Sequence, residues 1–313
     1  MSGPDDDKTI TVALLGNPNT GKSTLFSALC GVRQRVGNYP GVTVEKCVGR
    51  VEIGGRRFEV IDLPGTYSLA PRSPDEMVAV DLLLGCGGTT APPDVILCIV
   101  DASNLERNLY LVSQLFELGR PVVLALNKID LAAEQGWALD IALLRDRLGV
   151  SLVPTQAHRQ LGLEELKQAL LDAAASSALP RVAAPFPEAF SREVAALVQL
   201  SGLSHRSPLP RYLVERLLLD VGGYLEQAQP PVADPALLAA VQAARQRLAE
   251  AGLPAPAVET ISRYDWVIAV LDGVQTLAHT RPRSWSDRLD AVLTHKVWGV
   301  LIFALLMVVV FQS

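Results

Sequence analysis

Short apolar runs rich in β-branched residues alternate with amphipathic stretches between residues 10 and 174. Such runs predict strands buried on both faces of a sheet, and apolar residues at helical spacing predict helices. The predicted strands are residues 10–15, 46–53, 57–61, 95–100, 121–126 and 152–155, and the predicted helices are residues 23–29, 77–84, 105–118, 138–148 and 163–174. Residues 31–45 predict a loop, and Gly54-Gly55 predicts a hairpin turn. This order predicts an α/β fold with a mostly parallel sheet covered on both faces.

The composition changes after residue 176, where Ala, Pro, Leu and Arg predominate. Proline-containing segments separate amphipathic stretches near residues 188–201, 211–222, 235–251 and 258–279. Because no further strand pattern occurs, these stretches predict a second, all-helical domain. The expected domains are residues 9–176 and 177–280, after an acidic, disordered tail at residues 1–8 and before a final segment at residues 281–313.

Residues 297–311 contain no charged side chain. Because a membrane crossing needs roughly 20 apolar residues, this run predicts the start of a transmembrane helix that is cut short where the sequence ends. A buried core helix is the alternative interpretation. Arg281, Arg283, Arg288 and Lys296 precede the run, which predicts that the N-terminal side faces the cytoplasm.

The chain has 313 residues and a net charge of −5 at pH 7. At roughly 150 residues per domain, this length allows two globular domains. A protein without a basic excess has few side chains to neutralise phosphates along a nucleic acid, so nucleic acid is not an expected partner.

Residues 16–23, with the sequence GNPNTGKS, fit the G-x-x-x-x-G-K-[ST] pattern of a phosphate-binding loop. The loop lies between a predicted strand and a predicted helix, which is the order this motif requires. Gly16 and Gly21 let the backbone approach a polyphosphate closely, and the helix N-terminus favours the negative charge. Lys22 is expected to reach the β- and γ-phosphates, and the Ser23 hydroxyl to bind Mg²⁺.

Two further short motifs follow predicted strands. Asn127-Lys128-Ile129-Asp130 favours guanine, because the Asp130 carboxylate can accept hydrogen bonds from the base N1–H and 2-amino group. Asp62-Leu63-Pro64-Gly65 is a D-x-x-G motif, in which Asp62 is expected in the outer coordination sphere of Mg²⁺ and the Gly65 N–H beside the γ-phosphate. Together the motifs predict a Mg²⁺-dependent GTPase.

These motifs resemble the G1, G3 and G4 motifs of the translation-factor-like small GTPases. More narrowly, the chain resembles the ferrous iron transport protein B family in residues 16–19 (GNPN), 38–45 (NYPGVTVE), 62–69 (DLPGTYSL), 73–76 (SPDE) and 290–295 (DAVLTH). The resemblance covers nearly the whole chain. It implies a Ras-like GTPase domain, a helical domain like a nucleotide-dissociation inhibitor, and the start of a membrane region.

The resemblance also implies roles for individual residues. Thr43 matches the switch I threonine that binds Mg²⁺ and the γ-phosphate, and Thr155-Gln156-Ala157 matches the G5 loop beside guanine. Asn19 matches an asparagine that holds K⁺ against the phosphates in cation-activated GTPases. The implied catalytic residues are Lys22, Asn19, Thr43 and Gly65, and the implied metal ligands are Ser23, Thr43 and Asp62 for Mg²⁺ and Asn19 for K⁺. The residues expected to bind nucleotide are Gly16, Asn17, Pro18, Asn19, Thr20, Gly21, Lys22, Ser23, Thr24, Gly41, Val42, Thr43, Asp62, Leu63, Pro64, Gly65, Asn127, Lys128, Asp130, Thr155, Gln156 and Ala157.

Thr66 and Asp101 are left with open roles. Thr66 follows the D-x-x-G motif where many GTPases place a water-orienting glutamine, and it is too short for that task. We therefore expect backbone groups to orient the attacking water.

Asp101 ends a predicted strand near the nucleotide, where a structural cap and a part in catalysis are both compatible with the sequence.

The resemblance implies the GTP-hydrolysing part of a ferrous iron transporter in a bacterial inner membrane, with residues up to about 295 in the cytoplasm. Fe²⁺ would then pass only through a membrane region that lies outside this sequence. Small accessory proteins and a homo-oligomer are further partners that the resemblance suggests. One alternative is a regulatory GTPase switch outside iron transport, either membrane-tethered or soluble, which includes the RNA-modification and ribosome-type GTPases. The other alternative is a non-enzymatic regulatory module that signals by binding nucleotide, without a need for hydrolysis.

Overall fold

The computed structural model describes residues 9–31, 34–38, 45–70, 74–84, 92–176, 179–180, 186–204, 209–227, 234–277, 289 and 292–312. The predicted tail at residues 1–8 lies outside these ranges, as do Gly41, Val42 and Thr43 of the switch I prediction.

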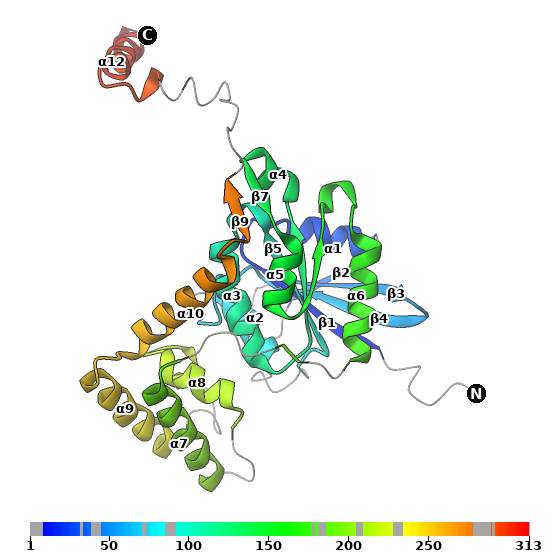
Figure 1. Ribbon diagram of the computed structural model, residues 1–313, viewed down its shortest axis with the longest axis vertical. Coiled ribbons are helices and arrows are strands. Elements are labelled where there is room, and N and C mark those ends of the chain that lie inside the picture. The colour runs from blue at the N-terminus through cyan, green and yellow to red at the C-terminus, as the bar shows by residue number, and fades with distance from the viewer. Residues whose placement is uncertain are drawn as a thin grey trace.

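A seven-stranded sheet forms the centre of the first domain, with the strand order β2-β3-β4-β1-β5-β6-β8 (Figure 1). The pairs β4–β1, β1–β5, β5–β6 and β6–β8 are parallel, whereas β2–β3 and β3–β4 are antiparallel. The predicted α/β fold with a mostly parallel sheet is therefore confirmed. The strands are β1 (Ile10–Gly16), β2 (Gln34–Asn38), β3 (Glu45–Ile53), β4 (Arg56–Asp62), β5 (Val95–Asp101), β6 (Val122–Asn127) and β8 (Ser151–Pro154).

Helices cover both faces of the sheet because each strand sends alternate apolar side chains to each side. On one face, Val12 and Leu14 of β1 pack against α1 (Lys22–Cys30) and α6 (Leu163–Ala175). On the other face, Ala13 and Leu15 share a cluster with α2 (Pro74–Leu84), α3 (Leu105–Leu115), α4 (Ile129–Glu134) and α5 (Ile141–Leu148). Short 3-10 turns lie at Ala102–Asn104, Phe116–Leu118 and Ala157–Arg159.

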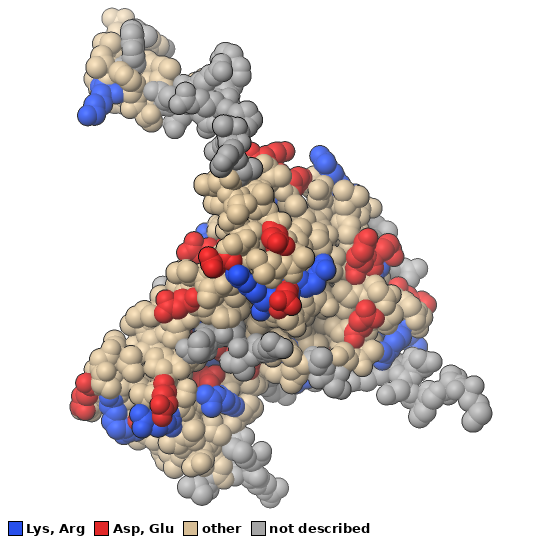
Figure 2. Space-filling view, viewed as in Figure 1, with Lys and Arg blue, Asp and Glu red and all other residues tan. Residues whose placement is uncertain are grey.

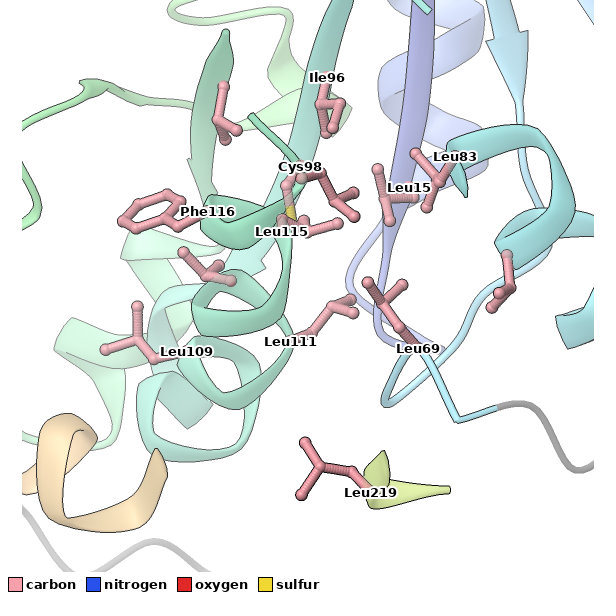
Figure 3. Packing of buried hydrophobic residues seen from close by; sticks show 14 of the residues in the cluster. Leu15, Leu69, Leu83, Ile96, Cys98, Leu109, Leu111, Leu115, Phe116 and Leu219 are labelled. Carbon is pink, nitrogen blue, oxygen red and sulfur yellow. The ribbon is translucent and has the colours of Figure 1, made fainter. Parts of the chain in front are cut away.

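A helical region follows, built from α7 (Glu188–Ser204), α8 (Arg211–Leu219), a 3-10 turn at Tyr224–Gln227, α9 (Pro235–Glu250) and α10 (Ala255–Leu271). Its core is continuous with the face of the sheet that α3 covers. Figure 3 shows Leu219 of α8 together with Leu69 and Leu111 in that cluster. The helical region is thus packed onto the first domain beside the segment that follows the D-x-x-G motif.

Three local predictions are wrong. The predicted loop at residues 31–45 contains the edge strand β2, whose polar sequence QRVGN carries no strand periodicity. The helix predicted at residues 138–148 begins only at Ile141, because Trp137–Leu139 forms β7 and α4 precedes it. The helix predicted to end at residue 279 ends at Leu271, and Gln275–Leu277 forms β9, so the region is not wholly helical. Strands β7 and β9 pair with each other, a long-range contact that local periodicity does not report.

The last described helix is α12 (Trp298–Gln312), which has 15 residues. Among the residues that the structure describes, no helix combines the length and the apolar character needed to cross a membrane. The transmembrane helix at the end of the chain stays a prediction.

Candidate nucleotide-binding site

The phosphate-binding loop connects β1 to α1, and close approaches explain both of its glycines. Gly21 has φ of 95°, in the left-handed region, and a Cβ on it would lie 2.5 Å from Nδ2 of Asn127. A Cβ on Gly16 would lie 2.6 Å from the carbonyl oxygen of Ile99 in β5. Either addition would displace the loop from the strands that support it. Ser23 and Thr24 are exposed in the first turn of α1, directly after Lys22.

Asn127 joins the phosphate-binding loop to the predicted G5 loop. Its Nδ2 donates to the carbonyl oxygen of Thr20 at 2.8 Å, and its Oδ1 accepts from the backbone N–H of Ala157 at 3.0 Å. The side chain is buried, so both bonds are shielded from water. The end of β6 therefore holds two loops at a fixed separation.

Lys128 makes a second connection to the same loop. Its Nζ donates to the carbonyl oxygen of Asn19 at 2.6 Å and to Oδ2 of Asp101 at 2.7 Å. Asn19 and Lys128 both have left-handed backbone conformations, with φ of 65° and 61°. Asp101 thus belongs to the site, although its position at a strand end was the only sequence signal for it.

Asp62 of the D-x-x-G motif lies beside the phosphate-binding loop. Its Oδ1 accepts from Nζ of Lys22, and both side chains are largely buried. Burial raises the pKa of the Asp62 carboxyl, an effect that the neighbouring Lys22 opposes. A Cβ on Gly65 would lie 3.3 Å from the backbone nitrogen of Pro18, so the D-x-x-G turn packs tightly on the loop.

The next residues of the same segment are also held in place. Thr66 is fully buried, and its N–H donates to the carbonyl oxygen of Gly16 at 3.2 Å. The Thr66 hydroxyl donates to the backbone carbonyl oxygen of Ser68 at 2.7 Å and so stabilises the turn. Tyr67 is exposed, and the Arg107 guanidinium lies 4.0 Å from its ring centroid, so Tyr67 contacts α3.

Asp130 lies in the first turn of α4, where its side chain is 25% exposed and its Oδ2 is 3.5 Å from Nε2 of His158. In the phosphate-binding loop and the predicted G5 loop, three buried polar atoms have no hydrogen-bond partner within the described residues: Oδ1 of Asn17, Oγ1 of Thr155 and Oε1 of Gln156. Buried polar atoms are normally satisfied. These three belong to the phosphate-binding loop and the predicted G5 loop, which fits a site for a polar ligand such as a nucleotide.

The geometry therefore brings the G1, G3, G4 and G5 segments together at the carboxyl ends of the parallel strands, where α/β proteins bind ligands. Residues 10–170 match the family model described as ferrous iron transport protein B. The structure of an S. thermophilus NFeoB variant bound to GDP is also similar, with a TM-score of 0.71 and 33% identity over 86% of this chain and 100% of that one.

The chain belongs to the ferrous iron transport protein B family. It is 34% identical to the Fe(2+) transporter FeoB of Escherichia coli (strain K12) over 97% of this chain and 38% of that protein. It is 48% identical to the Fe(2+) transporter FeoB of Legionella pneumophila (strain Paris) over 50% of this chain and 21% of that protein. The chain thus spans between about a fifth and two fifths of the length of these relatives. Its first domain is the GTPase domain of the family.

Proposed function

We propose that this GTPase domain binds GTP with Mg²⁺ and that its nucleotide state controls Fe²⁺ transport through a membrane region. Lys22 binds the β- and γ-phosphates, and Asp130 selects guanine. The hydroxyls of Ser23 and Thr43 would supply the hard oxygen ligands that suit Mg²⁺, and the Asp62 carboxylate would act from the outer coordination sphere of the ion. When bound, this ion neutralises charge on the phosphates. Backbone groups of the loop and of the D-x-x-G turn, including the Gly65 N–H, hold the γ-phosphate.

K⁺ is the proposed activator, and Asn19 is its proposed ligand. Asn19 is exposed at the surface of the loop, where its left-handed backbone is held by Lys128. A monovalent cation at this position would add positive charge where charge develops on the transferred phosphoryl group.

Replacing Asn19 by Ala should remove the preference for K⁺. We expect the wild type to hydrolyse GTP at least about tenfold faster in KCl than in NaCl, since a well-placed charge contributes that much or more. The Asn19→Ala protein should hydrolyse GTP equally slowly in both salts. Phosphate release at matched ionic strength measures this, with Gln168→Ala on the exposed face of α6 as the control. A wild type indifferent to the cation would contradict the potassium site.

One observation supports control by nucleotide state. The backbone N–H of Leu69, which follows the D-x-x-G motif, donates to Oε1 of Gln114 at 2.7 Å. The Nε2 of Gln114 donates to Oε1 of Glu259 in α10 at 2.7 Å. Gln114 is 1% exposed, so it links this segment to the helical region inside the protein. A change in the segment on hydrolysis would therefore reach the helical region directly.

The remaining assignments belong to the same proposal. Residues 177–280 act as a dissociation-inhibitor-like domain, and residues 281–313 lead from the cytoplasm into a bacterial inner membrane. Accessory proteins and a homo-oligomer fit this arrangement, and a relative in Porphyromonas gingivalis (strain ATCC BAA-308 / W83) is described as an Fe(2+) transport protein A/FeoB fusion. On the face seen in Figure 2, acidic and basic side chains intermingle among the described residues, which favours this function over an RNA-binding GTPase.

Replacing Lys22 by Ala tests the link to transport. Losing the ammonium that contacts the phosphates should slow GTP hydrolysis by at least about a hundredfold. Cells that lack their own ferrous iron uptake, and that produce the complete gene product with this change, should fail to accumulate radioactive Fe²⁺. Lys167→Ala, which removes an α6 lysine paired with Glu164, should change neither activity. Normal iron uptake with abolished hydrolysis would favour the alternative, a regulatory GTPase outside iron transport.

A further inference from the structure

Two consecutive carbonyl groups of the phosphate-binding loop are held by two consecutive residues at the end of β6. Lys128 Nζ binds the carbonyl oxygen of Asn19, and Asn127 Nδ2 binds the carbonyl oxygen of Thr20. The C=O and N–H of a trans peptide point in opposite directions. Fixing these carbonyls toward β6 therefore directs the N–H groups of Thr20 and Gly21 away from it, toward the concave side of the loop.

These two amides belong to the set that a phosphate-binding loop uses to surround phosphate oxygens. The peptide after Asn19 needs support, because Asn19 is a non-glycine residue in the left-handed region. Lys128 gives that support only if its flexible side chain is itself held. A lysine side chain loses rotamer entropy when it is fixed.

Asp101 is the group that holds Lys128. Its Oδ2 accepts from Nζ of Lys128 at 2.7 Å, and this pair is mostly buried, with 12% and 29% of the two side chains exposed. The other oxygen, Oδ1, accepts from the N–H of Ser103 at 2.9 Å and from its hydroxyl at 2.6 Å. The backbone of Asp101 is opposite Asn127 in the β5–β6 pairing. The carboxylate is therefore fixed on one side by the 3-10 turn and presented on the other to Lys128.

We propose that Asp101 is a positioning residue for nucleotide binding. Acting through Lys128, it fixes the peptide between Asn19 and Thr20 so that the Thr20 N–H faces the phosphates. It touches neither nucleotide nor metal. Its second role, as the cap of the 3-10 turn through Ser103, uses the other carboxylate oxygen and is chemically separable.

Because the two roles of Asp101 use different carboxylate oxygens, different variants can remove them one at a time. Asp101→Asn keeps the shape but removes the charge that attracts Lys128. Asp101→Ser keeps a good helix-capping oxygen and is too short to reach Lys128. Ser103→Ala removes one bond to Oδ1 and leaves the Lys128 pair intact. Lys128→Met removes the partner through which Asp101 is proposed to act.

The test is the rate at which a fluorescent N-methylanthraniloyl-GDP leaves the full chain when excess GDP is added. Asp101→Asn and Asp101→Ser should each speed release by about tenfold, the value expected when a charge-assisted hydrogen bond is lost. Ser103→Ala should stay within about twofold of the wild type, because the Lys128 pair is unchanged. In a Lys128→Met background, Asp101→Asn should add no more than about twofold.

Two results would overturn the proposal. If Ser103→Ala speeds release as much as Asp101→Asn, the effect arises from the cap of the turn and not from Lys128. If Asp101→Asn and Lys128→Met multiply their effects in the double variant, Asp101 acts independently of Lys128. Asp101→Ser keeps the test valid should Asp101→Asn fail to fold, because it retains the cap.

Discussion

Replacing Asp130 by Asn should weaken GTP binding by roughly a hundredfold to a thousandfold, because two hydrogen bonds to a carboxylate are lost or weakened. The carboxylate can accept from both N1–H and the 2-amino group of guanine. An asparagine offers one acceptor and turns an NH₂ donor toward a donor on the base. The fold should survive, since the Asp130 side chain is part-exposed and no apolar packing is removed. Equilibrium titration with a fluorescent GTP analogue measures the change.

Xanthosine triphosphate provides the matched control for this prediction. Xanthine carries a carbonyl at C2 where guanine carries an amino group, so the asparagine NH₂ can donate to it. The Asp130→Asn protein should therefore prefer xanthosine triphosphate over GTP, while the wild type shows the reverse order. Unchanged GTP affinity in the variant would mean that Asp130 does not select the base, whatever the affinity of the variant for xanthosine triphosphate.

The parts of the site that could be predicted are those whose functional groups lie close together in the sequence. The phosphate-binding loop, the D-x-x-G turn and the Asn127–Asp130 segment each place their functional groups within a few residues. Strand β1 and helix α1 could be predicted for the same reason, because the pattern of apolar residues that indicates each of them is local in the sequence. The Thr66 hydroxyl bonds to the carbonyl oxygen of Ser68, and the orientation of the attacking water by backbone groups stays a prediction.

The parts that could not be predicted depend on contacts between distant residues. Asp101 acquires its partner 27 residues later, and Gln114 contacts Glu259 across 145 residues. Strand β9 exists because it pairs with β7, and its sequence Gln-Thr-Leu carries no periodicity of its own. A strand of three residues is decided by its partner and not by its propensity.

A buried ion cluster connects α3 to the helical region and explains why Gln114 is held so firmly. Arg263 is fully buried; its guanidinium donates to Glu117 at 2.7 and 3.0 Å and to Glu259 at 2.8 Å. Arg216 of α8 also donates to Glu259. Burial alone would raise the pKa of Glu259, but Arg216 and Arg263 outweigh it and hold that pKa at about 2. Glu259 is thus ionised at neutral pH and is shared by two arginines and Gln114.

Replacing Glu259 by Gln should lower the free energy of unfolding by about 3 to 5 kcal/mol, because buried Arg216 would lose its ion pair with Glu259 and buried Arg263 would keep only its pair with Glu117. Urea unfolding followed by tryptophan fluorescence measures this, since Trp266 lies in α10 with its ring 6.3 Å from that of Phe116. Glu193→Gln, which breaks an exposed ion pair with Arg247, is the matched control and should shift the midpoint far less. The same substitution at Glu259 should also speed GDP release, because Gln114 loses its charged acceptor.

The stability that ionised Glu259 contributes should decrease as the pH falls. The pKa of Glu259 lies below its ordinary value of 4.5, so its stabilising effect is complete above that pH and is lost as the pH falls toward 2. The wild type should lose stability over that interval more steeply than Glu259→Gln, which has no carboxyl to protonate there. If the two proteins lose stability in parallel, the cluster does not carry the expected free energy. If Glu259→Gln is destabilised but releases GDP at the wild-type rate, the cluster holds the two domains together without transmitting the nucleotide state.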